Sequence, residues 1–186
     1  MTFGFIAKEF EKPLKEAIKG KTVLDLGAGD LEIAKALLEL GAKHIVAVDR
    51  DGFGRKYHPK IDTHHMYFDQ FMTMKKRPKW DVLFMSWPCN WDLPGVQQLL
   101  DVSKKIIIIS KCTDGSMCGT PKLWRYLSEL EVVWCIPHPK NVLTIYNNKT
   151  VEKRPLTGEE HAGIYEDKQE YSFWELHEYT RPLSEP

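Results

Sequence analysis

The chain has 186 residues, 42% of them hydrophobic and 28% charged, which is an ordinary composition for a globular domain that buries a core without disulfides or metals. Lys and Arg together number 26, as do Asp and Glu, so the net charge is zero and does not indicate a polyanionic partner, although a nucleic-acid partner stays open. No apolar run reaches the length of a membrane span, and neither a signal peptide nor a C-x-x-C pair is recognisable, so we expect a cytoplasmic protein with reduced cysteines and no membrane partner.

Strand-like and helix-like segments alternate along the chain. Apolar runs predict strands at 21–27, 44–49, 64–69, 81–87 and 105–110. Helical spacing of apolar residues predicts helices at 5–19, 31–40, 94–103 and 120–130. Pro13 should interrupt the first helix early, and Asp30 is a favourable N-cap for the second. The fifth strand contains four consecutive isoleucines, which fit a strand that is covered on both faces.

The last two strands are predicted at 131–137 and 141–147. Their connection is too short for a crossover helix, so they should be antiparallel. The whole pattern predicts an α/β fold with a doubly wound, mostly parallel seven-stranded sheet and an antiparallel final strand, arranged as a three-layer α/β/α sandwich. Residues 1–147 should form this domain, and residues 148–186 should be a C-terminal extension packed on it. A capping-box pattern predicts a short helix at 156–167.

The segment LDLGAGD at 24–30 joins the first strand to the second helix. A dinucleotide-binding loop needs a third glycine for close helix–strand packing, but Glu32 stands at that place. The acidic side chains around the loop would also disfavour a pyrophosphate. No G-K-[ST] sequence follows the glycines, so a Walker loop is excluded as well. A nicotinamide or flavin oxidoreductase is therefore a disfavoured alternative.

The same loop resembles the first motif of the class I S-adenosylmethionine-dependent methyltransferases, in which an acidic residue precedes G-x-G at the end of the first strand. The sequence VAVD at 46–49 resembles their second motif, an acidic residue that closes the second strand. The resemblance covers about residues 20–147, including the antiparallel final strand. It implies a Rossmann-like domain that binds S-adenosyl-L-methionine as its cofactor.

The resemblance also implies which residues hold the cofactor. Asp25 would face the amino group, Asp49 would accept hydrogen bonds from both ribose hydroxyls, and Asp69 would lie near the adenine amine. The alternatives are a turn role for Asp49 and a helix N-cap for Asp69. The complete set implied for the cofactor is Asp25, Gly27, Ala28, Gly29, Asp30, Asp49, Arg50, Asp69 and Ser86.

The acceptor site is predicted at the end of the fourth strand, where the sequence reads FMSWPCNW. Amino-methylating members of the family carry [DNS]-P-P-[aromatic] at this place. Ser86 and Pro88 match the first and third positions, whereas Trp87 replaces the first proline and Cys89 replaces the aromatic residue. Trp91 could supply the stacking ring instead. This half match favours a nitrogen nucleophile as the acceptor, with Ser86, Trp87, Pro88 and Cys89 as the catalytic candidates.

Two other functions stay open. Pro88 and Cys89 also resemble the Pro-Cys dipeptide of cytosine-C5 methyltransferases, and Cys112, after the fifth strand, resembles the cysteine of the RNA-modifying branch. Covalent catalysis would need a thiol with a depressed pKa, and buried structural cysteines are the plainer interpretation. A cofactor-binding module without catalysis is the other alternative.

The remaining polar motifs predict no further chemistry. The histidines show no metal-ligand spacing, so we expect no metal. The segment 49–65 contains Gly52, Gly54 and Pro59, so a loop is expected where relatives carry a helix. The prediction is therefore an S-adenosylmethionine-dependent methyltransferase that transfers a methyl group in line. Its acceptor and its oligomeric state are left undetermined by the sequence.

Overall fold

The computed structural model describes residues 6–51, 58–88, 93–110, 121–137 and 142–149. The strands are β1 (Thr22–Leu26), β2 (His44–Asp49), β3 (Ile61–His65), β4 (Val82–Ser86), β5 (Lys105–Ser110), β6 (Glu131–Pro137) and β7 (Val142–Asn147). The helices are α1 (Lys8–Ile18), α2 (Glu32–Glu39), α3 (Phe68–Thr73), α4 (Leu93–Asp101) and α5 (Pro121–Ser128).

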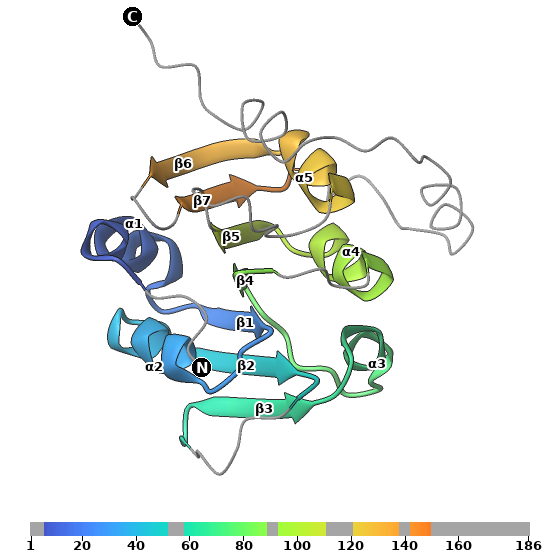
Figure 1. Cartoon of the computed structure of the whole chain (residues 1–186). Coiled ribbons are helices and arrows are strands. Elements are labelled where there is room, and N and C mark those ends of the chain that lie inside the picture. Colours follow the sequence, from blue (N-terminus) through green and yellow to red (C-terminus); the bar gives the residue numbers. More distant parts are fainter. Residues whose placement is uncertain (1–5, 52–57, 89–92, 111–120, 138–141, 150–186) are drawn as a thin grey trace, which may run out of the picture.

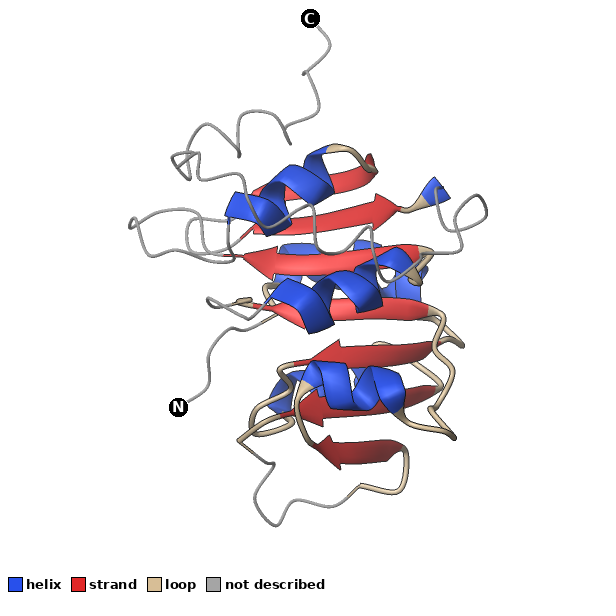
Figure 2. Ribbon diagram, turned by 90° about the vertical axis from the view of Figure 1, so that its right-hand side faces the viewer, coloured by secondary structure: helices blue, strands red, loops and turns tan. Residues whose placement is uncertain are grey.

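The described strands form one seven-stranded sheet with the order β3-β2-β1-β4-β5-β7-β6. Strands β1 to β5 are parallel, and β7 lies antiparallel between β5 and β6. The arrowheads of the parallel strands therefore lie together along one edge, on the left in Figure 2. The strand order reverses between β1 and β4, which is where ligands bind in open α/β sheets, beyond the carboxyl ends of the strands. The predicted doubly wound fold is confirmed.

Helices cover both faces of the sheet and make the three layers (Figure 1). Helices α1 and α2 lie on one face, and α3, α4 and α5 lie on the other. In β5, Ile107 and Ile109 belong to the core on the α1 face, whereas Ile106 and Ile108 belong to the core on the α3 face. All four isoleucines are fully or almost fully buried. The isoleucine run thus forms a strand that is covered on both faces, as the sequence predicts.

Helix α1 continues through Pro13, contrary to the predicted early interruption. Pro13 is buried along one face of the helix with Phe10, Leu14 and Ile18. A proline inside a helix removes one backbone hydrogen bond, at a cost of about 3 kcal/mol. Burial of this apolar face offsets that cost, because each large side chain contributes roughly 1.5–3 kcal/mol when fully buried.

Two local predictions are wrong. The third strand was expected at 64–69, but it pairs with β2 from Ile61 to His65, and α3 begins at Phe68. The Gln70 side chain accepts the Tyr67 backbone N–H at 3.1 Å, which favours a helix start over a longer strand. The N-cap of α2 is Leu31, in a left-handed conformation, and Asp30 instead accepts the Glu32 backbone N–H at 3.4 Å.

The connection between β2 and β3 contains no helix in its described residues, 50, 51 and 58–60, in agreement with the expected loop. No helix in the described ranges has the length and apolarity that a membrane crossing requires. The predicted extension and its helix at 156–167 lie outside the described residues from position 150 onward, so both stay predictions.

Candidate functional site

The candidate site begins where β1, β2 and β4 end side by side. Leu26 pairs with Val48 of β2 and with Met85 of β4. The next residues along each strand are therefore Gly27, Asp49 and Ser86. Neighbouring strands lie about 4.8 Å apart, so these three positions are adjacent at the carboxyl edge of the sheet. The sheet brings together sequence-predicted residues that are far apart in the chain.

The loop after β1 is held against β2 by backbone hydrogen bonds. Gly27 N–H donates to the Val48 carbonyl at 2.8 Å, and Ala28 N–H donates to the same oxygen at 3.4 Å. Gly27 and Gly29 have φ values of 74° and 53°, which are strained for residues that carry a Cβ. No heavy atom lies within 4 Å of where a Cβ would stand on Gly29, apart from its own chain neighbours. Both glycines thus serve the turn itself, and Gly29 has open space beside it among the described residues.

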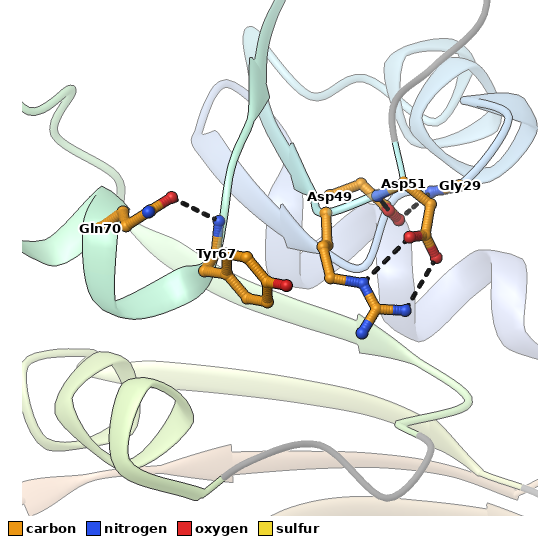
Figure 3. A network of polar contacts seen from close by, with 6 residues as sticks. Gly29, Asp49, Asp51, Tyr67 and Gln70 are labelled. Carbon is orange, nitrogen blue, oxygen red and sulfur yellow. Dashed lines mark hydrogen bonds and ion pairs between the residues drawn. The ribbon is translucent and has the colours of Figure 1, made fainter.

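Asp49 links this loop to the turn that follows β2 (Figure 3). Its Oδ2 accepts the Gly29 N–H at 2.8 Å, and its Oδ1 accepts the Asp51 N–H at 2.8 Å. Each carboxylate oxygen can accept a second hydrogen bond. Asp49 therefore shapes the turn, as the plainer interpretation holds, and still has capacity for two hydroxyl donors.

Asp25 is the buried carboxyl group of the site. Its residue is 1% exposed, and its Oδ2 has no hydrogen-bond partner among the described residues. Burial, and then the nearby charge of Asp49, raises the pKa of Asp25 to about 7. Such a carboxyl group is costly to ionise unless a cation approaches it. The site thus contains a buried acceptor that a positively charged ligand group would satisfy.

Arg50, Asp51 and Tyr67 form the rim beside Asp49. Arg50 makes a two-point ion pair with Asp51, with N–O distances of 2.9 and 3.2 Å. The Arg50 guanidinium lies 6.0 Å from the centre of the Tyr67 ring. Figure 3 shows that ring pointing from the start of α3 toward the turn. Tyr67 is 56% exposed, which is unusual for a large aromatic side chain.

Tyr67 was missed by the sequence analysis. The segment 64–69 was interpreted as a strand, and a tyrosine in a strand indicates nothing about a ligand. The available signal was its place two residues before Asp69, where a base-binding acid was expected. An exposed ring beside a cation at the end of a strand offers a flat surface on which a base could stack.

Asp69 lies on the first turn of α3 and is exposed. Its Oδ1 accepts the Gln70 N–H at 2.8 Å, so it stabilises the helix start without being the N-cap, which is Tyr67. Because β3 is parallel to β2, the start of α3 is at the same edge of the sheet as Asp49. The structure therefore brings Asp69 to the predicted edge, and among the described contacts none joins it to Asp49.

The end of β4 has an unusual backbone. The Ser86 Oγ is buried and has no hydrogen-bond partner among the described residues. Trp87 has a φ of 52°, and its N–H donates to the Ile109 carbonyl at 2.7 Å. A left-handed conformation costs a residue with a Cβ roughly 1–2 kcal/mol, and such strain concentrates at functional sites. Pro88 is buried next to it.

Cys89, Cys112 and the stacking candidate Trp91 lie outside the described residues. Within the described ranges, no three His, Cys, Asp or Glu side chains gather as metal ligands would.

The fold was compared with known protein families, curated proteins and solved structures. No protein-family model matches the sequence, and no curated protein does. TrmK from M. capricolum, solved with its natural cofactor product S-adenosyl-homocysteine, matches with a TM-score of 0.50 at 13% identity over 80% of this chain and 75% of that one. The chain has the class I methyltransferase fold.

Two further structures share this methyltransferase fold. A protein from Pyrococcus horikoshii, proposed to be an RNA methyltransferase, matches with a TM-score of 0.53 at 17% identity over 74% of this chain and 81% of that one. YhhF from Escherichia coli, proposed to be a methyltransferase, matches with a TM-score of 0.54 at 13% identity over 76% of this chain and 82% of that one. At these identities the likeness concerns the fold.

Replacement of Asp25 by Asn should stabilise the methyltransferase fold at neutral and alkaline pH. The folded chain retains the Asp25 proton up to about pH 7, whereas the unfolded chain loses it near pH 4, so wild-type stability should fall between these values and then stay low. Asp25→Asn should remove this fall, with a gain of up to about 4 kcal/mol above pH 7, because each unit of pKa shift is worth about 1.4 kcal/mol. Urea unfolding from pH 4 to pH 9 measures this gain in the free energy of unfolding.

The exposed Asp69→Asn variant is the charge-matched control. Equal pH dependence of stability in wild type and Asp25→Asn would contradict the raised pKa of Asp25.

At Trp87, substitution by glycine should destabilise the fold less than substitution by alanine, which is the reverse of the ordinary order. Alanine pays roughly 1–2 kcal/mol in the left-handed region, and glycine loses only about 0.5–1 kcal/mol through its freer unfolded chain. Trp87→Gly should therefore be more stable than Trp87→Ala by about 0.5–1 kcal/mol in denaturant unfolding. At Trp80, which has no positive φ, the order should be the ordinary one, with alanine better. If the alanine variant were more stable than the glycine variant at both positions, the left-handed conformation of Trp87 would be contradicted.

Proposed function

We propose that this chain is an S-adenosylmethionine-dependent methyltransferase that binds its cofactor at the carboxyl edge of β1 and β2. The observation that carries the proposal is the placement of a buried carboxyl group, Asp25, whose Oδ2 has no partner among the described residues, near a second carboxylate, Asp49, at the glycine loop. The class I methyltransferase fold, the S-adenosylhomocysteine bound in TrmK, and the two sequence motifs support the same cofactor.

The donor set matches the chemistry of this cofactor better than that of a dinucleotide. S-adenosylmethionine carries an ammonium group, a sulfonium and a ribose diol, and it has no phosphate. Asp25 would receive the ammonium, which would supply the missing partner of its Oδ2. Asp49 would accept from the ribose hydroxyls through its remaining lone pairs. Two carboxyl groups at one loop would instead repel a pyrophosphate.

Other residues would complete the cofactor site. The backbone of Gly27, Ala28 and Gly29 would contact the methionyl part, since no side chain obstructs Gly29. Asp30, at the start of α2, would lie beside the same group. The Tyr67 ring would stack on the base, with Arg50 and Asp69 at its rim.

The end of β4 would position the acceptor. When bound, the cofactor supplies a methyl group that its sulfonium has already activated for an in-line displacement. The chain's own task is alignment, which can lower a barrier by roughly 7–11 kcal/mol. The buried Ser86 Oγ would accept a hydrogen bond from the attacking group, and the strained Trp87 and Pro88 would fix the entry to it. A hydroxyl acceptor at this place favours an amino group as the nucleophile.

Cofactor binding tests the proposal directly. Titration calorimetry should show that S-adenosylhomocysteine binds and that NAD does not. Asp49→Ala should weaken the binding by about ten- to a hundredfold, because a hydrogen bond to a charged group contributes about 1.5–3 kcal/mol.

Asp62→Ala is the matched control, since Asp62, on β3, pairs with His44 of β2 near the other edge of the sheet. It should leave the affinity unchanged. Comparable binding of NAD, or unchanged affinity in a folded Asp49→Ala protein, would overturn the proposed cofactor site.

Substitutions at the end of β4 test the acceptor. Methyl transfer from labelled cofactor is first screened on RNA, DNA, protein and metabolite extracts. Ser86→Ala should then slow transfer by about two- to tenfold for each neutral hydrogen bond lost. Cys89→Ser and Cys112→Ser should keep most activity.

Loss of all turnover in either cysteine variant would favour the cytosine-C5 alternative, in which the thiolate attacks the base. Cofactor binding without turnover on any extract would favour a non-catalytic binding module.

A further inference from the structure

Lysines line the edge of the sheet opposite to the candidate site. Four strands that are neighbours in the order β3-β2-β1-β4 are each preceded by a lysine within three positions of the first strand residue. These residues are Lys60, Lys43, Lys21 and Lys79, and together they are called the lysine row.

Backbone hydrogen bonds show that the members of the lysine row lie side by side. Lys43 N–H donates to the Lys21 carbonyl at 2.8 Å, and Ile45 N–H donates to the Lys60 carbonyl at 2.9 Å. Asp81, two residues after Lys79, is bonded to Thr22 through both its backbone N–H and its carboxylate. The strand spacing of about 4.8 Å spreads the row over roughly 14 Å.

The row is exposed, and its charge is not neutralised locally. All four lysines are exposed, and no ion pair between described residues includes any of them. Two acidic residues that are close to the row in sequence, Asp81 and Asp62, have other partners. Asp81 accepts the Thr22 N–H, and Asp62 pairs with His44 at 3.0 Å.

Lysines can also stabilise helix ends, and this accounts for part of the pattern. Helices α1 and α2 end just before Lys21 and Lys43, where a positive charge favours the helix dipole. Lys60 has no such explanation, because none of the described residues between β2 and β3 is helical. The row runs across β3, β2, β1 and β4 without a gap. The described helix ends would account for Lys21 and Lys43 but not for Lys60.

Further lysines belong to the other connections at this edge of the sheet. Lys75 and Lys76 follow α3 and are exposed. Lys104 and Lys105 stand at the start of β5, and Lys149 follows β7, where it pairs with Glu131 at 3.0 Å. The carboxyl edge differs from this edge, because the carboxylate of Asp49 lies at its centre.

We propose that the lysine row is a docking surface for the phosphodiester backbone of a nucleic acid. A linear array of regularly spaced cations fits a linear polyanion, and backbone contacts of this kind position a nucleic acid without reading its sequence. A membrane surface fits less well. None of the large apolar side chains exposed in the described ranges precedes β3, β2, β1 or β4, and interfacial membrane binding needs apolar anchors.

The docking surface does not depend on methyl transfer. The strands of five or six residues separate it from the cofactor edge by roughly 16–20 Å, at about 3.3 Å per residue. It would hold a part of the nucleic acid away from the reacting atoms. Loss of the lysine row should therefore leave binding of S-adenosylhomocysteine unchanged.

The test compares two triple variants of the full chain. Lys21→Gln/Lys43→Gln/Lys60→Gln removes three charges from the row. Lys8→Gln/Lys12→Gln/Lys35→Gln removes the same charge from α1 and α2, and thermal unfolding checks that both variants fold. Fluorescence anisotropy with labelled RNA and DNA of about 20 nucleotides, single- and double-stranded, measures affinity over a range of salt.

The row variant should bind at least about tenfold more weakly than wild type at about 100 mM salt, and its logarithmic salt slope should be smaller by about two to three. The control variant should change the affinity by less than about threefold. The RNA and DNA arms show which nucleic acid the surface prefers. Equal losses in both variants, no binding by wild type, or row-dependent binding to phosphatidylserine vesicles in place of nucleic acid would each overturn the proposal.

Discussion

The carboxylate of Asp49 is the contact on which the candidate site depends. It accepts one backbone N–H from the loop after β1 and another from the turn after β2, both at 2.8 Å. Bonds between an anion and backbone donors are stronger than neutral ones, so two loops that start on different strands share one anchor. Gly29 can meet that anchor because it adopts a positive φ. With Gly29 held in this way, the space beside it stays open among the described residues.

Three unfavourable features lie at the same edge of the sheet. Asp25 is buried beside a second negative group, Ser86 has a buried hydroxyl without a described partner, and Trp87 is strained. Each of these lowers stability, and each faces the place where the strand order reverses. The rest of the central sheet is apolar and well buried on both faces, as β5 illustrates. Proteins tolerate such local costs where a ligand relieves them.

The two ends of the strands differ in charge because the fold is directional. Parallel strands place all their carboxyl ends at one edge, and the helices that follow them run the other way. Acidic residues at strand ends therefore meet around β1 and β2, whereas the residues between a helix and the next strand meet at the opposite edge. Lys21 and Lys43, which are distant in sequence, become neighbours joined by a backbone hydrogen bond.

Local pattern was sufficient for much of the fold. The isoleucine run of β5, the short connection between β6 and β7, and the helix after the glycine loop all have signals within a few residues of sequence. The start of β3 was misplaced because HHMYFD contains a short apolar and aromatic run that suits a strand, while pairing with β2 begins earlier, at Ile61. The continuity of α1 through Pro13 was missed because it depends on burial against the sheet.

The sequence by itself determined the order of the strands, the glycine loop and the acids near the ends of β1 and β2, since each of these is a short-range pattern, whereas α3 was not predicted. Only the tertiary structure decided that Gly27, Asp49 and Ser86 lie side by side, that Asp25 keeps its proton up to about pH 7, and that Tyr67 borders the site. It also decided that four lysines from four loops form one row. The reason is physical: strand register and burial are long-range properties, and the pKa of a group depends on what surrounds it in space.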